Sequence, residues 1–326
     1  MATDSSLPVP YFERHPSPAA RSLERAFVSA VTHRSEPPLK QLVRSPVRTA
    51  IARAANLIES RVRWSVPTRT RTFWGARMSI RLPEPISTQL FSYGFFEPGL
   101  TAYMLRILNP GDTVLDVGAH YGYFTLLAAD LVGMEGKVHA FEPTPGTFGV
   151  LMSNARGRLN IVTNEVAVWA ERADISVTDL GPRLSAFNTA FAPRLSEREL
   201  LRHKTRQVSV PAISLDNYCT EHGLRPAFVK VDAESSEHYI LQGMKWVLGE
   251  PRPFVTLEVG DFDLPDVPRS SELVRSMMSN DYVPFEYSDG GLAIHDLRES
   301  YEYDNLLFGP SEHPLVELAK RQSKGR

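Results

Sequence analysis

Short apolar runs alternate with stretches of helical periodicity through the middle of this 326-residue chain. Because parallel strands must be joined by crossovers, usually helices, this alternation predicts a mostly parallel sheet with helices on both faces. The runs that we interpret as strands are Thr113 to Val117, Val138 to Phe141, Ile161 to Val166, Phe228 to Val231 and Phe254 to Val259.

Residues 167 to 226 are too long to form one crossover between neighbouring strands. They contain, in order, a β-like stretch, a polar loop, a charged helical pattern and a second β-like stretch: Ile175 to Val177, Ser185 to Thr189, Ser196 to His203 and Gln207 to Ile213. We expect an inserted hairpin and a flap over the site. Near the carboxyl end, Tyr282 to Tyr287 and Leu306 to Phe308 predict an antiparallel strand pair.

The first 80 residues differ in charge from the rest of the chain. They carry 13 lysines and arginines against 5 aspartates and glutamates, whereas the whole chain has a net charge of −2. Residues 1 to 18 are rich in proline and serine, and helical patterns follow at Ala19 to His33 and Pro38 to Arg63. An apolar stripe from Val47 to Ile58 in the second helix predicts docking on the rest of the chain or on a second subunit.

A glycine turn follows the first core run. The run ends in Asp116, glycines stand at Gly118 and Gly122, and a helical pattern starts at Tyr123. A strand, a glycine turn and a helix in this order let a ligand approach bare backbone, because glycine has no Cβ. The turn is therefore expected to hold a nucleoside.

The glycine spacing and the next acidic residue indicate which nucleoside binds. The dinucleotide pattern Gly-x-Gly-x-x-Gly is missing, since His120 stands where that pattern has its second glycine, so a phosphate-poor ligand fits better. The second core run ends in Glu142, 20 residues beyond Gly122, where such folds bind ribose hydroxyls. We interpret the turn as a site for S-adenosylmethionine.

Three segments carry a resemblance to a known family: Asp116 to Thr125, Phe228-Val-Lys-Val-Asp-Ala-Glu-Ser-Ser-Glu237 and Leu257 to Val259. Together they resemble the FkbM family of S-adenosylmethionine-dependent methyltransferases, whose pattern at the second segment is Lys-Ile-Asp-Val-Glu-Gly-Ala-Glu. The similarity spans about residues 95 to 260. Two positions depart from the family, because His120 replaces the usual Asn and Ser235 replaces the usual Gly.

This resemblance implies a Rossmann-like class I methyltransferase fold of the α/β class, with a seven-stranded, mostly parallel sheet and helices on both faces. It also implies methyl transfer to a hydroxyl, and we expect a sugar, a glycan or a polyketide-like metabolite as the acceptor. The expected parts are a basic, largely helical N-terminal extension, a methyltransferase domain and a C-terminal tail, at residues 1–75, 76–310 and 311–326. The domain divides into a cofactor half, the inserted flap and a substrate half, at about 95–170, 171–226 and 227–310.

Ligands of open α/β sheets bind beyond the carboxyl ends of the strands, and this rule places five residues on one rim: Asp116, Gly118, Glu142, Asp232 and Glu258. Asp232 follows the run expected beside the first one and is the best candidate for a general base, with Glu234 and Glu237 as further catalytic carboxylates. These carboxylates could instead hold a divalent cation such as Mg, or complement the positive end of the following helix. We expect cofactor contacts from Glu97, Asp116, Gly118, His120, Tyr121, Gly122 and Glu142.

Composition excludes several other classes of site. The single cysteine, Cys219, excludes an intramolecular disulfide and a thiolate zinc site, and the His-Glu-x-x-His, Gly-x-Ser-x-Gly and phosphate-loop motifs do not occur. The first residues lack the pattern of a secretory signal, and no apolar run reaches the about 18 to 20 residues that span a bilayer. We therefore expect a cytoplasmic protein.

Two other functions stay open at this point. A nucleic-acid methyltransferase could use the basic N-terminal arm to hold phosphates, although we consider nucleic acid the less favoured partner. The fold could also serve as a non-catalytic binding module, against which the retention of Asp116, Glu142 and Asp232 argues. The N-terminal helices are the expected contact of a homo-oligomer, and capping of the following helix is the alternative role for Glu97.

Overall fold

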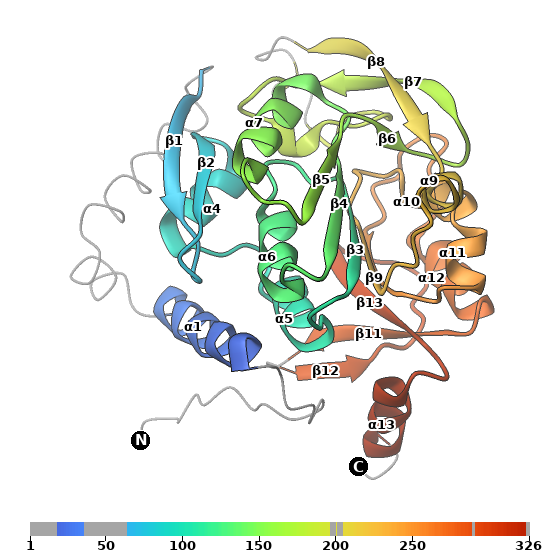
Figure 1. The fold of residues 1–326 in the computed structure, drawn as a ribbon. Helices are drawn as coiled ribbons and strands as arrows, with labels where there is room; N and C mark the ends of the chain where they lie inside the picture. Colours follow the sequence, from blue (N-terminus) through green and yellow to red (C-terminus); the bar gives the residue numbers. More distant parts are fainter. Residues whose placement is uncertain (1–17, 36–63, 196–199, 201–204, 289–290, 324–326) are drawn as a thin grey trace.

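An eight-stranded mixed sheet lies at the centre of the computed structural model, which describes residues 18–35, 64–195, 200, 205–288 and 291–323 (Figure 1). From one edge to the other, its strands are β12 (Gly291–Ile294), β11 (Tyr282–Ser288), β13 (Asp304–Pro310), β10 (Phe254–Val259), β9 (Phe228–Val231), β3 (Thr113–Val117), β4 (Lys137–Phe141) and β5 (Ile161–Asn164). The five strands from β10 to β5 are parallel, and the three strands at the other edge pair in antiparallel fashion.

Helices cover both faces of this sheet. One face carries α5 (Pro98–Ile107), α6 (Tyr123–Val132) and α7 (Pro145–Ala155), with α4 (Pro85–Tyr93) beside them in the same apolar layer, and the other carries α9 (Leu215–His222), α10 (Glu237–Gln242), α11 (Lys245–Gly249) and α12 (Ser270–Ser279). In β3, Val114 packs with the first layer, whereas Leu115 and Val117 pack with the second. This period of two is the pattern of a strand buried on both sides.

The predicted α/β class and the five parallel strands are confirmed, and so is the antiparallel pair near the carboxyl end. The predicted count of seven strands is too low by one, because Gly291–Ile294 pairs with β11 and adds an edge strand. The run predicted as one strand over Ile161 to Val166 also needs correction. Its sheet pairing ends at Asn164, and Ala167–Val168 pairs in a separate sheet.

The predicted insertion forms a small sheet of its own. Its strands are β6 (Ala167–Val168), β8 (Arg206–Ile213) and β7 (Ala173–Asp179), in that order. The antiparallel pairing of β7 with β8 confirms the expected hairpin. Between them, the chain passes through the 3-10 helix η1 (Ser185–Phe187). Of the helix expected near Ser196 to His203, all but residue 200 lies outside the described residues.

The first predicted helix is found as α1 (Pro18–Arg34), which packs against the first helical layer. Phe27 is buried there, with its ring centroid 5.3 Å from Phe73 and 5.7 Å from Phe95. The second predicted helix, Pro38 to Arg63, and its apolar stripe lie outside the described residues. After it, β1 (Val66–Arg71) pairs with β2 (Arg77–Leu82) in antiparallel fashion.

The carboxyl-terminal segment ends in α13 (Pro314–Ser323), which buries Leu315, Val316 and Ala319 against the core. Among the helices that the structure describes, none is both long enough and apolar enough to cross a membrane.

Candidate active site

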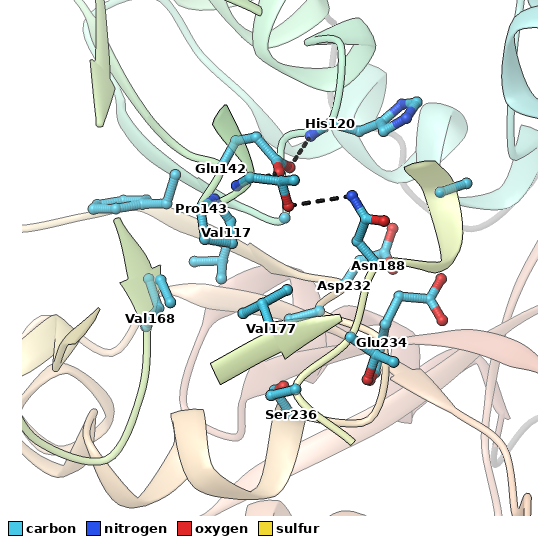
Figure 2. A pocket seen from close by; sticks show the side chains of 18 of the residues that line it. Val117, His120, Glu142, Pro143, Val168, Val177, Asn188, Asp232, Glu234 and Ser236 are labelled. Atoms are coloured by element: carbon cyan, nitrogen blue, oxygen red, sulfur yellow. Dashed lines mark hydrogen bonds between the residues drawn. The ribbon is translucent and has the colours of Figure 1, made fainter. Parts of the chain in front are cut away.

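A pocket opens beyond the carboxyl ends of β3, β4 and β9, where their loops meet the inserted segment (Figure 2). Ligands of open α/β sheets bind at this edge. The cavity measures about 110 Å³. Its wall combines aliphatic side chains with carboxylates: Val117, Val166, Val168, Ile175 and Val177, and Glu97, Glu142, Asp232 and Glu234.

Gly118 brings the ends of β3 and β9 into contact. Its φ is +73°, and a Cβ at this position would lie 1.7 Å from the backbone oxygen of Asp232. Gly122 has a φ of +89°, and its Cβ would lie 2.6 Å from Leu151 Cδ1. We expected Gly118 to let a ligand approach the backbone closely. The atom that would lie nearest to a Cβ at Gly118 is instead the backbone oxygen of Asp232.

Both oxygens of Glu142 accept hydrogen bonds from the backbone. The N–H of His120 donates to Oε2 at 3.1 Å, and the N–H of Thr144 donates to Oε1 at 3.0 Å. Burial raises the pKa of Glu142 to about 7, although these hydrogen bonds act in the opposite direction. Because each carboxylate oxygen has a second lone pair, Glu142 can still accept hydrogen bonds from ligand hydroxyls.

His120 and Tyr121 connect the glycine turn to the inserted segment. His120 Nε2 and Ser185 Oγ are hydrogen-bonded at 2.9 Å, and the Tyr121 hydroxyl lies 3.0 Å from the same oxygen. The two rings stack with their centroids 3.9 Å apart. Burial lowers the pKa of His120 to about 3, so the ring is neutral near pH 7. These two side chains therefore hold η1 over the turn.

A buried lysine, Lys230, lies between the predicted carboxylates. Its Nζ is 3.3 Å from Asp116 Oδ1 and 3.4 Å from Asp232 Oδ2, and it donates to the carbonyl of Gly118 at 3.0 Å. Burial opposes the charge on Lys230, but Asp232 and Asp116 outweigh this effect and raise its pKa. Asp116 also accepts a hydrogen bond from Thr125 at 2.5 Å. Asp116 thus lies behind Lys230 and supports it.

Asp232 and Glu234 belong to a cluster of carboxylates that also includes Glu258. One oxygen from each of the three lies within 4.8 Å of the other two. Burial raises the pKa of Glu234 to about 8. Glu237 lies beside this cluster and accepts a hydrogen bond from the N–H of Ala233 at 2.9 Å, just before α10. Glu237 is the first residue of α10, which is the position that the structural alternative of complementing the positive end of this helix requires.

Arg194 of the inserted segment enters the same cluster, a contact that no sequence motif predicts. Its Nη1 donates to Glu258 and lies 3.5 Å from Glu234 Oε2. Its Nε and Nη2 donate to Ser235 Oγ at 3.0 and 2.8 Å. The serine that departs from the family pattern therefore binds an arginine that comes from 41 residues earlier in the chain.

Glu97 stands at the N-cap position of α5, but within the described residues its side chain makes no capping hydrogen bond. Its Oε1 accepts a hydrogen bond from the Tyr303 hydroxyl at 2.8 Å, and its Oε2 is buried without a partner there. Burial and the nearby Asp232 raise the pKa of Glu97 to about 7. The structure therefore shows no capping role for the Glu97 side chain, and Glu97 lines the pocket.

The structure brings most of the candidate residues to one pocket. Those that line it are Glu97, Gly118, His120, Glu142, Asp232 and Glu234. Those that stand behind its wall are Asp116, Tyr121, Gly122 and Glu237. Sequence reasoning missed Ser185, Tyr303 and Arg194, because none of them lies in a motif that the family resemblance covers and all three arrive through long-range contacts.

Comparison with known proteins places these features in a family. The family model of the methyltransferase FkbM domain matches residues 116–284. The 31-O-demethyl-FK506 methyltransferase FkbM of Streptomyces tacrolimicus is 28% identical over 161 residues, which are 42% of this chain and 61% of that protein. A ribosomal RNA large subunit methyltransferase E of Sorangium cellulosum is 33% identical over 95 residues, which are 28% of this chain and 45% of that protein.

The chain thus spans about half to three fifths of the length of these curated relatives. Among solved structures, a methyltransferase FkbM from Methylobacillus flagellatus KT is similar with a TM-score of 0.37 and 12% identity, over 80% of this chain and 59% of that one. Because the family model covers more than half of the sequence and includes Asp116, Glu142 and Asp232, the chain belongs to the FkbM methyltransferase family.

Proposed function

We propose that this protein transfers a methyl group from S-adenosylmethionine to a hydroxyl of a sugar, a glycan or a polyketide-like metabolite. The observation that carries the proposal is the position of Asp232. Its carboxylate lines the same pocket as Glu142 and is held 3.4 Å from the ammonium group of Lys230. The pocket therefore presents a proton acceptor beside the residues that are suited to bind a nucleoside.

The residues of the pocket fit this cofactor. Glu142 can accept hydrogen bonds from the ribose hydroxyls, and Val168 and Val177 offer an apolar surface to the adenine (Figure 2). The carboxylate of Glu97, which lines the pocket, suits the ammonium group at the methionine end. When bound, S-adenosylmethionine supplies a methyl group that its positive sulfonium activates toward nucleophiles.

Asp232 is the proposed general base. A hydroxyl is a weak nucleophile, so the acceptor oxygen must lose its proton as it forms the new bond to carbon. Asp232 takes this proton, while Lys230 fixes the direction of its carboxylate through their ion pair. Lys230 is itself anchored by the carbonyl groups of Val117 and Gly118. We assign to Lys230 and Asp116 the role of positioning Asp232. Lys230 contacts Asp232 directly, and Asp116 acts on it through Lys230.

Two observations support a small hydroxylated acceptor. The relative from Streptomyces tacrolimicus is named a 31-O-demethyl-FK506 methyltransferase, so the position that its name gives for the methyl group is an oxygen. The inserted segment also forms one wall of the pocket, because Thr189 donates to the backbone oxygen of Glu234 at 2.7 Å and Asn188 donates to Thr144 at 3.2 Å. A wall on this side favours an acceptor that enters the pocket over a large surface that docks on it.

Methyl transfer by Asp232→Asn tests the proposal. The substitution preserves shape and removes the proton acceptor, and we expect the turnover rate to fall about 10²- to 10⁴-fold while cofactor affinity stays nearly unchanged. Asp263→Asn, at an exposed residue in the loop after β10, is the matched control and should transfer methyl groups at the wild-type rate.

The panel of acceptors offered to the wild type and both variants contains sugars, glycans, macrolide-type metabolites and RNA. Equal rates for the two variants would remove Asp232 as the base, and RNA as the preferred acceptor would exclude the small hydroxylated acceptor.

A further inference from the structure

The guanidinium of Arg194 is enclosed almost completely by the acidic cluster. Three of its nitrogens bond to Glu258 and Ser235, and its Cζ lies 3.9 Å from the ring centroid of Phe262. The side chain is only 11% exposed, although it comes from the inserted segment and not from the central sheet. An arginine on a loop is usually solvated and its ion pairs contribute little, whereas Arg194 is half-buried and makes three hydrogen bonds.

The cluster that Arg194 enters has the make-up of a divalent cation site. Asp232, Glu234 and Glu258 each present one carboxylate oxygen within 4.8 Å of the other two, and oxygen ligands are those that magnesium and manganese prefer. Glu258 is 3% exposed, and among the described residues its Oε2 has no hydrogen-bond partner. Three ionised carboxylates so close together repel one another, and a positive charge beside them stabilises this ionised form.

Arg194 occupies the edge of the cluster where a cation would bridge two of its members. Its Nη1 donates to Glu258 Oε1 and lies 3.5 Å from Glu234 Oε2, so one nitrogen contacts both carboxylates. Asp232 receives its positive charge from the other side, through Lys230. Each of the three carboxylates thus has a side-chain cation of the protein beside it.

We propose that Arg194 is a built-in cation that takes the place of a divalent metal ion in this cluster. The acidic wall of the pocket then stays intact without metal, and the inserted segment supplies the charge that holds it together. That this acidic wall serves methyl transfer rests on the proposed function. The exclusion of metal by Arg194 does not depend on it.

Ser235 has a conformation that suits this role. Its φ is +79°, a left-handed backbone conformation that favours glycine. Its hydroxyl oxygen accepts the hydrogen bonds of Arg194 Nε and Nη2. A serine at this φ strains the backbone. Its two hydrogen bonds hold the guanidinium in one orientation. Arg194 is therefore a positioned group rather than a solvated loop charge.

Calorimetric titration of the full-length chain with manganese chloride tests the proposal. Arg194→Met removes the charge but keeps most of the apolar length, and it should raise manganese affinity about tenfold or more over the wild type, since a nearby positive charge opposes a divalent cation. Arg194→Lys should bind manganese as weakly as the wild type. Arg206→Met, in β8 of the same insertion, is the matched control, because Arg206 pairs with Asp179 away from the cluster.

Equal manganese affinity of Arg194→Met and the wild type would overturn the proposal. If Arg194→Met does not fold, Arg194→Gln provides the second test, since it also removes the positive charge while keeping a polar side chain that can donate to Ser235. It should bind manganese more tightly than the wild type, and no gain would again overturn the proposal. Absence of methyl transfer by every variant and by the wild type would contradict the proposed function and leave the metal result standing.

Discussion

At the scale of single residues, one missing Cβ decides whether β3 and β9 can meet. Gly118→Ala would set a methyl group 1.7 Å from the backbone oxygen of Asp232 and would force an L-residue into a φ of +73°. Strained backbone alone costs about 1 to 3 kcal/mol. We expect a larger loss of unfolding free energy in urea, together with loss of methyl transfer, because the displaced backbone carries Asp232.

Gly181→Ala separates the two causes. Gly181 has a φ of +76°, close to that of Gly118, but a Cβ there would meet nothing within 4 Å. It therefore reports the backbone strain without the contact. Equal destabilisation of the two variants would show that the contact between Gly118 and Asp232 contributes nothing.

Glu142 makes the stability of the cofactor-free protein depend on pH. Its pKa is about 7 in the folded protein and ordinarily 4.5, so between these values the folded state holds a proton that the unfolded state has released. Stability should therefore fall as the pH rises from about 4.5 to 7, by up to about 3 kcal/mol for this group. We expect the melting temperature of Glu142→Gln to fall less over this range than that of the wild type.

The comparison depends on slopes, because glutamine keeps only one acceptor oxygen for the two backbone N–H groups of His120 and Thr144. That loss lowers stability at every pH and leaves the slope untouched. If the melting temperatures of wild type and variant change equally with pH over this range, the raised pKa of Glu142 is contradicted.

At the scale of elements, α1 is held to the domain by Phe27. Its ring is 5% exposed and packs against Phe73 and Phe95. Phe27→Ala should lower the unfolding free energy by about 3 to 5 kcal/mol, the usual loss for a buried aromatic side chain. Leu159→Ala is the control, since Leu159 is 77% exposed. A loss as small as that of the control would mean that α1 does not dock on the domain in solution.

The elements that periodicity predicts well are those with one strong local pattern. The apolar strand Phe228–Val231 and the helix α1 were predicted almost to the residue. The strand β1, Val66–Arg71, was missed because its residues are mostly polar and exposed, so only its pairing with β2 identifies it. Likewise, the break after Asn164 depends on which sheet Ala167 joins, and no local pattern records that choice.

At the scale of the whole molecule, the site is assembled from parts that are distant in sequence. The strand-end rule predicted the shared rim of Asp232 and Glu142, because it follows from parallel topology alone. It could not predict Arg194, which meets Glu258 across 64 residues, or Tyr303, which meets Glu97 across 206. Such contacts depend on the path of the insertion and of the carboxyl-terminal strands, which the motifs do not contain.

The most direct test of the account is the affinity of the cofactor product. Titration calorimetry with S-adenosylhomocysteine should detect binding to the wild type and a loss of about 1.5 to 3 kcal/mol for Glu142→Ala, the usual effect of removing hydrogen bonds to a charged group. NAD should bind more weakly than S-adenosylhomocysteine, because the glycine turn lacks the dinucleotide pattern. Unchanged affinity in the variant, or tighter binding of NAD, would contradict the assignment of this pocket to S-adenosylmethionine.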